Sequence, residues 1–159
     1  MGPEIVNLKF ILNILLFVGL YSGICTSSPT DQEVSGTTKT AISKLEMHLS
    51  AFGVESDDFP SIDVYVDFLN DSSNCHKWYY DPKHKDSTYH LTPGEIKKIL
   101  SLLETTDLGK IKTDYTSQMS DQPASTTTIF AGQQQFVIRD YGLQAGDPFK
   151  TLYQLVYKF

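Results

Sequence analysis

The feature that most constrains the fold of this chain is a regular alternation of apolar and polar side chains in two segments. Residues 45–51 are apolar at each odd-numbered position. Residues 62–68 are apolar at each even-numbered position, and Asp63, Tyr65 and Asp67 lie between these apolar residues. Because successive side chains of a strand point to opposite faces of a sheet, a period of two predicts strands with one buried and one exposed face. We therefore expect two half-buried strands, the first of which begins near Ile42.

Turn residues and further patterned segments predict the rest of a sheet. Residues 70–74 consist of Asn, Asp and Ser, which favour turns. Segment 105–122 has no regular pattern and is predicted to be irregular, whereas residues 131–134 are expected to join two strands. Further strands are predicted over residues 75–80, 87–91, 125–130 and 135–141.

A first helix is predicted to begin after Thr92. The Thr92 side chain can accept from the backbone N–H of Glu95, whose carboxylate can reach back to the cap, and Pro93 suits the first helical position. The expected buried stripe, opposite Lys97 and Lys98, consists of Ile96, Ile99, Leu100 and Leu103.

A second helix is predicted at the end of the chain, where Asp147 and Pro148 are expected to cap it. Its expected buried stripe consists of Phe149, Leu152, Leu155, Val156 and Phe159. Runs of strands that are each followed by a helix favour an α+β domain. We expect a single domain over residues 42–159, built as an antiparallel sheet with two helices packed on one face, in the order strands, helix, strands, helix.

The start of the chain is predicted to direct export. Residues 10–20 are apolar except for Asn13 and Gly19, and small residues follow. A membrane-spanning helix needs about 20 mostly apolar residues, so this shorter run is typical of a signal peptide, assigned here to residues 1–25. Residues 26–41 are rich in Ser and Thr and are predicted to form a flexible tether.

Cys25 leaves the end of the signal peptide open. Signal peptidase could cleave after Cys25 or after Ser27, because both positions follow suitable small residues. Alternatively, Cys25 becomes the lipidated first residue of a lipoprotein, and the protein is then anchored to a membrane. The expected location is accordingly periplasmic, outer-membrane-anchored or extracellular.

Charge and cysteine content exclude two classes of protein. The formal net charge is −6, and nucleic-acid binding needs clustered Lys and Arg that this chain lacks. Cys75 is the sole cysteine of the predicted domain, so an internal disulfide is excluded and a packed core must supply the stability. We expect Cys75 to be a buried or half-buried thiol, with an intermolecular disulfide as the alternative.

Several short motifs of the chain form a familiar series. They are Phe52-Gly53, Phe59-Pro60 before the strand over residues 62–66, Thr92-Pro93-Gly94-Glu95, the segment from Tyr115 to Asp121-Gln122-Pro123, and residues 137–142 before Pro148 and Leu152. Together they resemble a bacterial envelope family. The family is a domain of unknown function found mostly in secreted proteins and lipoproteins, and it usually begins with Cys-Phe-Gly-x-Cys-Pro. The resemblance extends from about Lys44 to Phe159.

The chain departs from this family at both cysteines of the opening motif. Ala51 and Phe59 stand where the resemblance places them, with a longer loop between. A bridge, redox couple or metal site that used the pair is therefore excluded here. We expect Ala51 and Phe59 to replace the pair by apolar packing.

The candidates for chemistry are few. His76, His84 and His90 lie near Cys75, and imidazole and thiolate are zinc or copper ligands. Their spacing fits no compact metal motif, and solvent-exposed histidines are the favoured interpretation. No Gly-x-Ser-x-Gly turn and no phosphate-binding glycine loop is present in the sequence. We therefore expect no catalytic residue, no metal and no cofactor.

The aromatic residues give a positive indication of binding. Tyr65, Trp78 and Tyr80 lie on predicted strands or at their ends, and alternation puts some aromatic rings on the sheet face away from the helices. Exposed aromatic side chains are common in recognition surfaces. The alternative is that these rings fill cross-strand pairs at the edge of the core.

Three function classes follow from the sequence. The favoured class is an exported, non-enzymatic envelope module that binds an unknown protein or envelope ligand through its sheet. The second is a secreted inhibitor or immunity-type protein, which small size and net acidity would suit. The least favoured class is a metal-dependent enzyme.

Overall fold

The computed structural model describes residues 40–52, 54 and 58–158, all of which belong to one compact unit, Thr37–Phe159. The predicted signal peptide, Cys25, Phe159 and all but two residues of the predicted tether lie outside the described residues.

A seven-stranded sheet dominates the fold, with strand order β4-β3-β2-β1-β6-β7-β5. All neighbouring strands are antiparallel except β5 and β7, which are parallel. The strands are β1 Ile42–Ser50, β2 Ser61–Asp67, β3 Ser72–Trp78, β4 Ser87–Tyr89, β5 Asp114–Thr116, β6 Ala124–Ala131 and β7 Gln134–Tyr141. This sheet and its helices confirm the α+β class.

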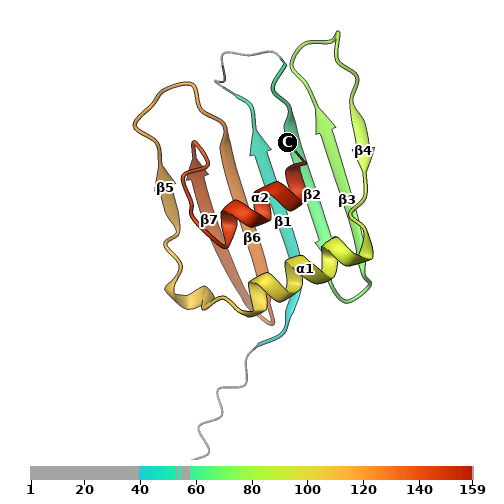
Figure 1. Cartoon of the computed structure of the whole chain (residues 1–159), viewed down its shortest axis with the longest axis vertical. Coiled ribbons are helices and arrows are strands. Elements are labelled where there is room, and N and C mark those ends of the chain that lie inside the picture. The colour runs from blue at the N-terminus through green and yellow to red at the C-terminus, as the bar shows by residue number, and fades with distance from the viewer. Residues whose placement is uncertain (1–39, 53, 55–57, 159) are drawn as a thin grey trace, which may run out of the picture. The chain divides into compact units, whose positions relative to one another are not determined.

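In the part of the chain that the structure describes, two α-helices accompany the sheet: α1 spans Pro93–Glu104 and α2 spans Phe149–Tyr157. A 3-10 turn, η1, spans Leu108–Lys110. Figure 1 shows α1 and α2 crossing in front of the strands, with α2 over the middle of the sheet. Among the described residues, no helix combines the length and hydrophobicity needed to cross a membrane.

The start of α1 has the predicted capping box. The backbone N–H of Glu95 donates to Thr92 Oγ1 at 3.2 Å, and the backbone N–H of Thr92 donates to Glu95 Oε2 at 2.6 Å. The bonds that the Glu95 carboxylate accepts from the backbone N–H and the hydroxyl of Thr92 lower the pKa of Glu95. Two otherwise unpaired backbone donors at the helix start are thereby satisfied.

The apolar faces of both helices differ in part from the prediction. In α1, Ile96, Ile99 and Leu103 are buried, whereas Leu100 is only half-buried. In α2, Phe149, Leu152 and Val156 are buried as expected, but Leu155 is only half-buried. Tyr153 and Tyr157 complete the buried face of this helix. The prediction counted only aliphatic residues and Phe as core formers, so it left out tyrosines whose hydroxyl groups find partners in the interior.

The core lies between the helices and the sheet. Leu45 and Leu49 of β1 and Ile62 and Val66 of β2 are fully buried beneath the helices. Cys75 of β3 belongs to the same layer as a free, buried thiol, as predicted, and burial raises its pKa to about 11.

Polar groups also hold the second half of the domain together. The buried Asp140 carboxylate accepts from the backbone N–H groups of Gln144 and Ala145, at 2.7 and 2.9 Å, and from the Tyr153 hydroxyl at 3.0 Å. Because a buried carboxylate needs such donors, these three bonds join β7, the loop that follows it and α2.

Several predictions of element bounds and caps were wrong. Strand β3 begins at Ser72, inside the predicted turn cluster 70–74. The segment predicted to be irregular contains η1 and β5, because β7 supplies a parallel edge with which residues 114–116 pair. Pro148 occupies the N-cap of α2 without a side-chain cap, and Asp147 instead accepts a hydrogen bond from Thr151 Oγ1 at 2.8 Å.

Candidate functional site

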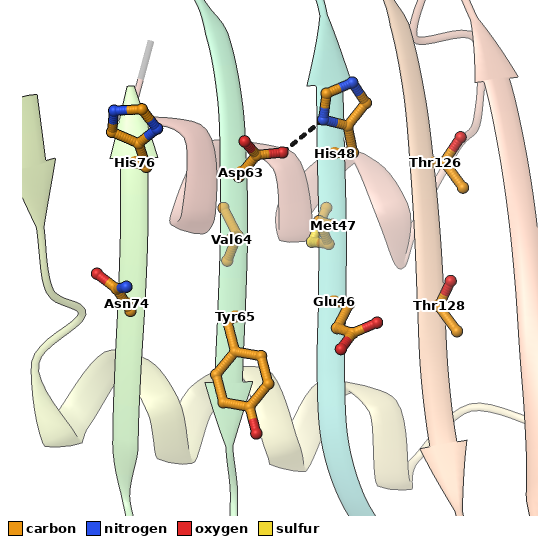
Figure 2. A pocket seen from close by; sticks show the side chains of 10 residues that line it. All are labelled: Glu46, Met47, His48, Asp63, Val64, Tyr65, Asn74, His76, Thr126 and Thr128. Carbon is orange, nitrogen blue, oxygen red and sulfur yellow. Dashed lines mark hydrogen bonds and ion pairs between the residues drawn. The ribbon is translucent and has the colours of Figure 1, made fainter. Parts of the chain in front are cut away.

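The candidate site is the face of the sheet opposite α1 and α2, which we call the open face. It is formed by alternate residues of the four strands β3, β2, β1 and β6, and it includes a hollow of about 380 Å³. Its outward side chains are Glu46, His48, Asp63, Tyr65, Asn74, His76, Thr126 and Thr128. Figure 2 shows these side chains in front of the strands, with the helices behind.

The strand register arranges these eight side chains in two rows across the sheet. In the first row, His76 is opposite Asp63, Asp63 is opposite His48, and His48 is opposite Thr126. Residues at such paired positions point to the same face, and Figure 2 shows this row above the second one.

The second row is displaced by two residues along each strand. Asn74 is opposite Tyr65, Tyr65 is opposite Glu46, and Glu46 is opposite Thr128. Between the rows, Met47 and Val64 line the hollow at buried positions whose side chains belong to the core on the other side of the sheet. The open face is thus a polar surface over the strand backbones.

The first row continues to both edges of the sheet. Thr88 of β4 is opposite His76, Arg139 of β7 is opposite Thr126, and Asp114 of β5 is opposite Arg139. All three residues are exposed. Polar side chains therefore occupy this row on every strand of the sheet.

The carboxylates of the open face have partners within the protein. His48 Nδ1 and Asp63 Oδ1 are 2.5 Å apart, and about half of each side chain remains exposed. Lys44 Nζ is 2.8 Å from Glu46 Oε1, and this hydrogen bond raises the pKa of Lys44. Each of these two carboxylates therefore has a partner within the protein.

The neighbouring carboxylates are also paired. Arg139 Nη1 is 3.8 Å from Asp114 Oδ1 at the β5 edge. At the end of β2, the side-chain amide of Asn70 donates to Asp67, and this bond, with backbone donors, lowers the pKa of the Asp67 carboxyl.

Tyr65 is the aromatic residue at the centre of this surface. Its side chain is 41% exposed, and in Figure 2 its ring lies along the sheet with one face turned outward. Lys44 Nζ is 5.4 Å from the centre of the Tyr65 ring and 4.1 Å from the centre of the Phe130 ring. The cation thus lies between two aromatic side chains, an arrangement that stabilises it.

The three aromatic residues predicted to bind a partner do not lie side by side. Tyr65 is opposite Asn74 in β3, whereas Trp78 is four residues further along β3 and half-buried. Tyr80 lies beyond the end of β3 and is 78% exposed. Of the three, Tyr65 is the residue that lines the hollow.

The three candidate metal-binding histidines are also separated. His76 is on the open face. His84 lies in the loop after β3, and its Nε2 is 2.7 Å from Asp58 Oδ1. His90 forms a hydrogen bond with the Ser73 carbonyl. Within the described residues, no group of three or more His, Cys, Asp or Glu side chains is placed to hold a metal ion.

His48 and the first row of the open face were not predicted from the sequence. The alternation in residues 45–51 already made position 48 an outward position. It could not show that β1 pairs with β2 in the register that puts His48 opposite Asp63, because register is fixed by the whole sheet.

A second hollow, of about 460 Å³, lies at the other end of the sheet, between the end of α1 and the start of β1. Thr40, Ile42, Leu108 and Phe136 are among its lining residues. It presents few ionisable groups, and Asp107, which does line it, is already engaged with Lys110 at 2.9 Å.

Comparison with protein-family models gives a match. Residues 57–159 match the family model of a domain of unknown function, DUF6438. The match includes Phe59 but not Ala51. Neither the comparison with curated proteins nor the comparison with solved structures gave a match.

Proposed function

The chain belongs to the DUF6438 family, and from that premise we propose that it is an exported, non-enzymatic module whose open face binds a component of the bacterial envelope. The observation that carries this proposal is the polar hollow over the four strands β3, β2, β1 and β6. A concave site with several convergent polar groups is the usual form of a ligand site.

The chemistry of the open face favours a polar ligand over a large protein partner. Stable protein interfaces have an apolar, aromatic-rich centre. In the described part of the chain, the exposed large hydrophobic side chains are Phe52, Tyr65, Leu69, Tyr80 and Met119, and Tyr65 is the one that belongs to the open face. One exposed ring among polar side chains is too little apolar surface for such a centre.

Export is part of the same proposal. It is supported by the apolar run at residues 10–20 with its following small residues, and by the resemblance to envelope proteins. In that location, a domain held by a tether or by a lipid on Cys25 would meet envelope polymers first.

Cosedimentation of the secreted protein with isolated bacterial envelopes tests the proposal. A Thr128→Arg variant places a long cation in the hollow, and Gln154→Arg adds the same charge on an exposed position of α2. We expect wild type and Gln154→Arg to pellet with the envelopes and Thr128→Arg to stay in the supernatant. Equal pelleting of both variants, or no pelleting of wild type, would overturn the proposal.

A further inference from the structure

The open face carries hydrogen-bonding groups that the protein itself does not use. Within the described residues, the side chains of Asn74, His76, Thr126 and Thr128 make no hydrogen bond to the protein. Hydroxyl groups can donate and accept, the amide of Asn74 does both, and a neutral imidazole has one donor and one acceptor. These groups can therefore bond a ligand that offers both donors and acceptors.

The charged groups of the same surface are already engaged. Asp63 contacts His48, Glu46 contacts Lys44, and Arg139 contacts Asp114. An anionic ligand is normally held by Arg or Lys side chains aimed at it, and here both cations face carboxylates of the protein. This arrangement favours a neutral ligand over an anion such as a phosphate.

Tyr65 adds an apolar surface at the centre of the polar one. Its outward ring face can cover a patch of C–H groups, and an aromatic ring does so with little loss of conformational entropy. Asn74 and Glu46 flank it in the same row. A ligand that suits these neighbours has an apolar face and a polar rim.

A pyranose ring combines these properties: C–H groups on its faces and hydroxyl groups around its edge. We propose that the ligand of the open face is a neutral saccharide chain, with one sugar stacked on Tyr65 and hydroxyl groups bonded to the two rows. Neighbouring strands are about 4.8 Å apart, so four strands offer room for a chain of more than one sugar. This inference rests on the proposed function and names the ligand class for the same surface.

Titration of the full secreted chain with defined saccharides, followed by amide NMR shifts, tests this assignment. The neutral probes are the trimers of β-linked glucose and of N-acetylglucosamine, and the anionic probe is trigalacturonate. We expect a neutral trimer to shift amides of β1, β2, β3 and β6, with an affinity that stays constant between about 0.05 and about 0.5 M NaCl, because uncharged ligands are not screened by salt.

Matched variants separate stacking from general surface effects. Tyr65→Ala should weaken binding of the neutral trimer roughly tenfold, as loss of a central aromatic contact does, whereas Tyr80→Ala removes an exposed ring outside the open face and should change nothing. Equal effects of both variants, binding of trigalacturonate alone, or no shift of open-face amides with either neutral trimer would each overturn the saccharide assignment.

The sedimentation experiment keeps the two proposals apart. If Thr128→Arg abolishes pelleting while both neutral trimers leave the spectrum unchanged, the open face binds an envelope component and the saccharide assignment is wrong. If Thr128→Arg pellets like wild type, the open face is not the binding surface and both proposals are wrong.

Discussion

The two faces of the sheet are built from the same strands and have opposite properties. In β1, Leu45 and Leu49 are fully buried under the helices, whereas Glu46 and His48 between them face outward. The difference teaches that one alternating pattern specifies both the core and the candidate site. Substitutions at the core-facing positions of a strand should therefore change stability, and substitutions at the outward positions between them should change binding, because neighbouring residues on a strand contribute to different layers.

The largest expected effect is on the covered face. Leu103→Ala and Leu152→Ala each remove a fully buried side chain, and we expect each to lower the free energy of unfolding by about 2–5 kcal/mol, because a cavity remains. Thr128→Ala on the open face should stay within about 0.5 kcal/mol of wild type. Urea denaturation measures the free energy of unfolding of all three variants. Similar losses at the three positions would show that the covered face does not contribute more to stability than the open face.

The next effect concerns the polar bonds of the covered side. Tyr153→Phe removes the hydroxyl that donates to the buried Asp140, and hydrogen bonds to charged groups contribute about 1.5–3 kcal/mol. Tyr115→Phe, at a half-buried ring of β5, serves as the control. A loss no greater than that of the control would mean that Asp140 is satisfied by the Gln144 and Ala145 backbone donors alone.

A smaller loss of stability is expected at the start of α1, the helix that follows β4 in the chain. Thr92→Ala removes the oxygen that accepts from Glu95 and should cost about 0.5–2 kcal/mol, the usual contribution of an N-cap. Thr88→Ala, on the exposed side of β4, should cost less. Thermal unfolding of the two variants compares them, and an equally small loss at Thr92 would show that Pro93 alone suffices to start the helix.

The smallest effect appears only at alkaline pH. Burial raises the pKa of Cys75 from its ordinary value of 9.0 to about 11. Between these values the unfolded chain loses this proton while the folded chain keeps it, so stability falls as pH rises from about 9 to about 11. Tyr89 and Tyr153 act in the same direction, because burial raises their pKa as well.

Comparison with Cys75→Ala isolates the cysteine contribution. The variant should be less stable at neutral pH but should lose less of its remaining stability between pH 9 and 11 than wild type, as followed by urea denaturation at each pH. Parallel pH profiles for the two proteins would show that the thiol does not contribute.

Local patterns were sufficient to predict most of the fold. The alternation around residues 45–51 and 62–68 predicted two strands and their buried faces, and the residues from Thr92 to Glu95 predicted the start of α1. Strand β5 could not be predicted, since three residues are too few to show a period and the β7 residues with which they pair lie 25 positions further along the chain, as Arg139 does opposite Asp114.

The candidate site was only partly accessible to the same reasoning. The prediction of Tyr65 as a binding residue remains a prediction, although the residue lies on the open face. The pairing of His48 with Asp63 depends on the β1–β2 register, which hydrophobic pattern and turn geometry set together. Tyr153 and Tyr157 were missed for a similar reason, because their hydroxyl partners, Asp140 of β7 and Ser125 of β6, come from other elements of the fold.

The two outermost strands have a consequence for how copies of the protein behave together. β4 and β5 are each three residues long, and the longer strands all lie between them. Asp86 borders β4 and Asp114 begins β5. Long, uncharged edges invite strand addition from neighbouring chains, and short or charged ones discourage it. Copies of this domain are thereby protected against aggregating edge to edge.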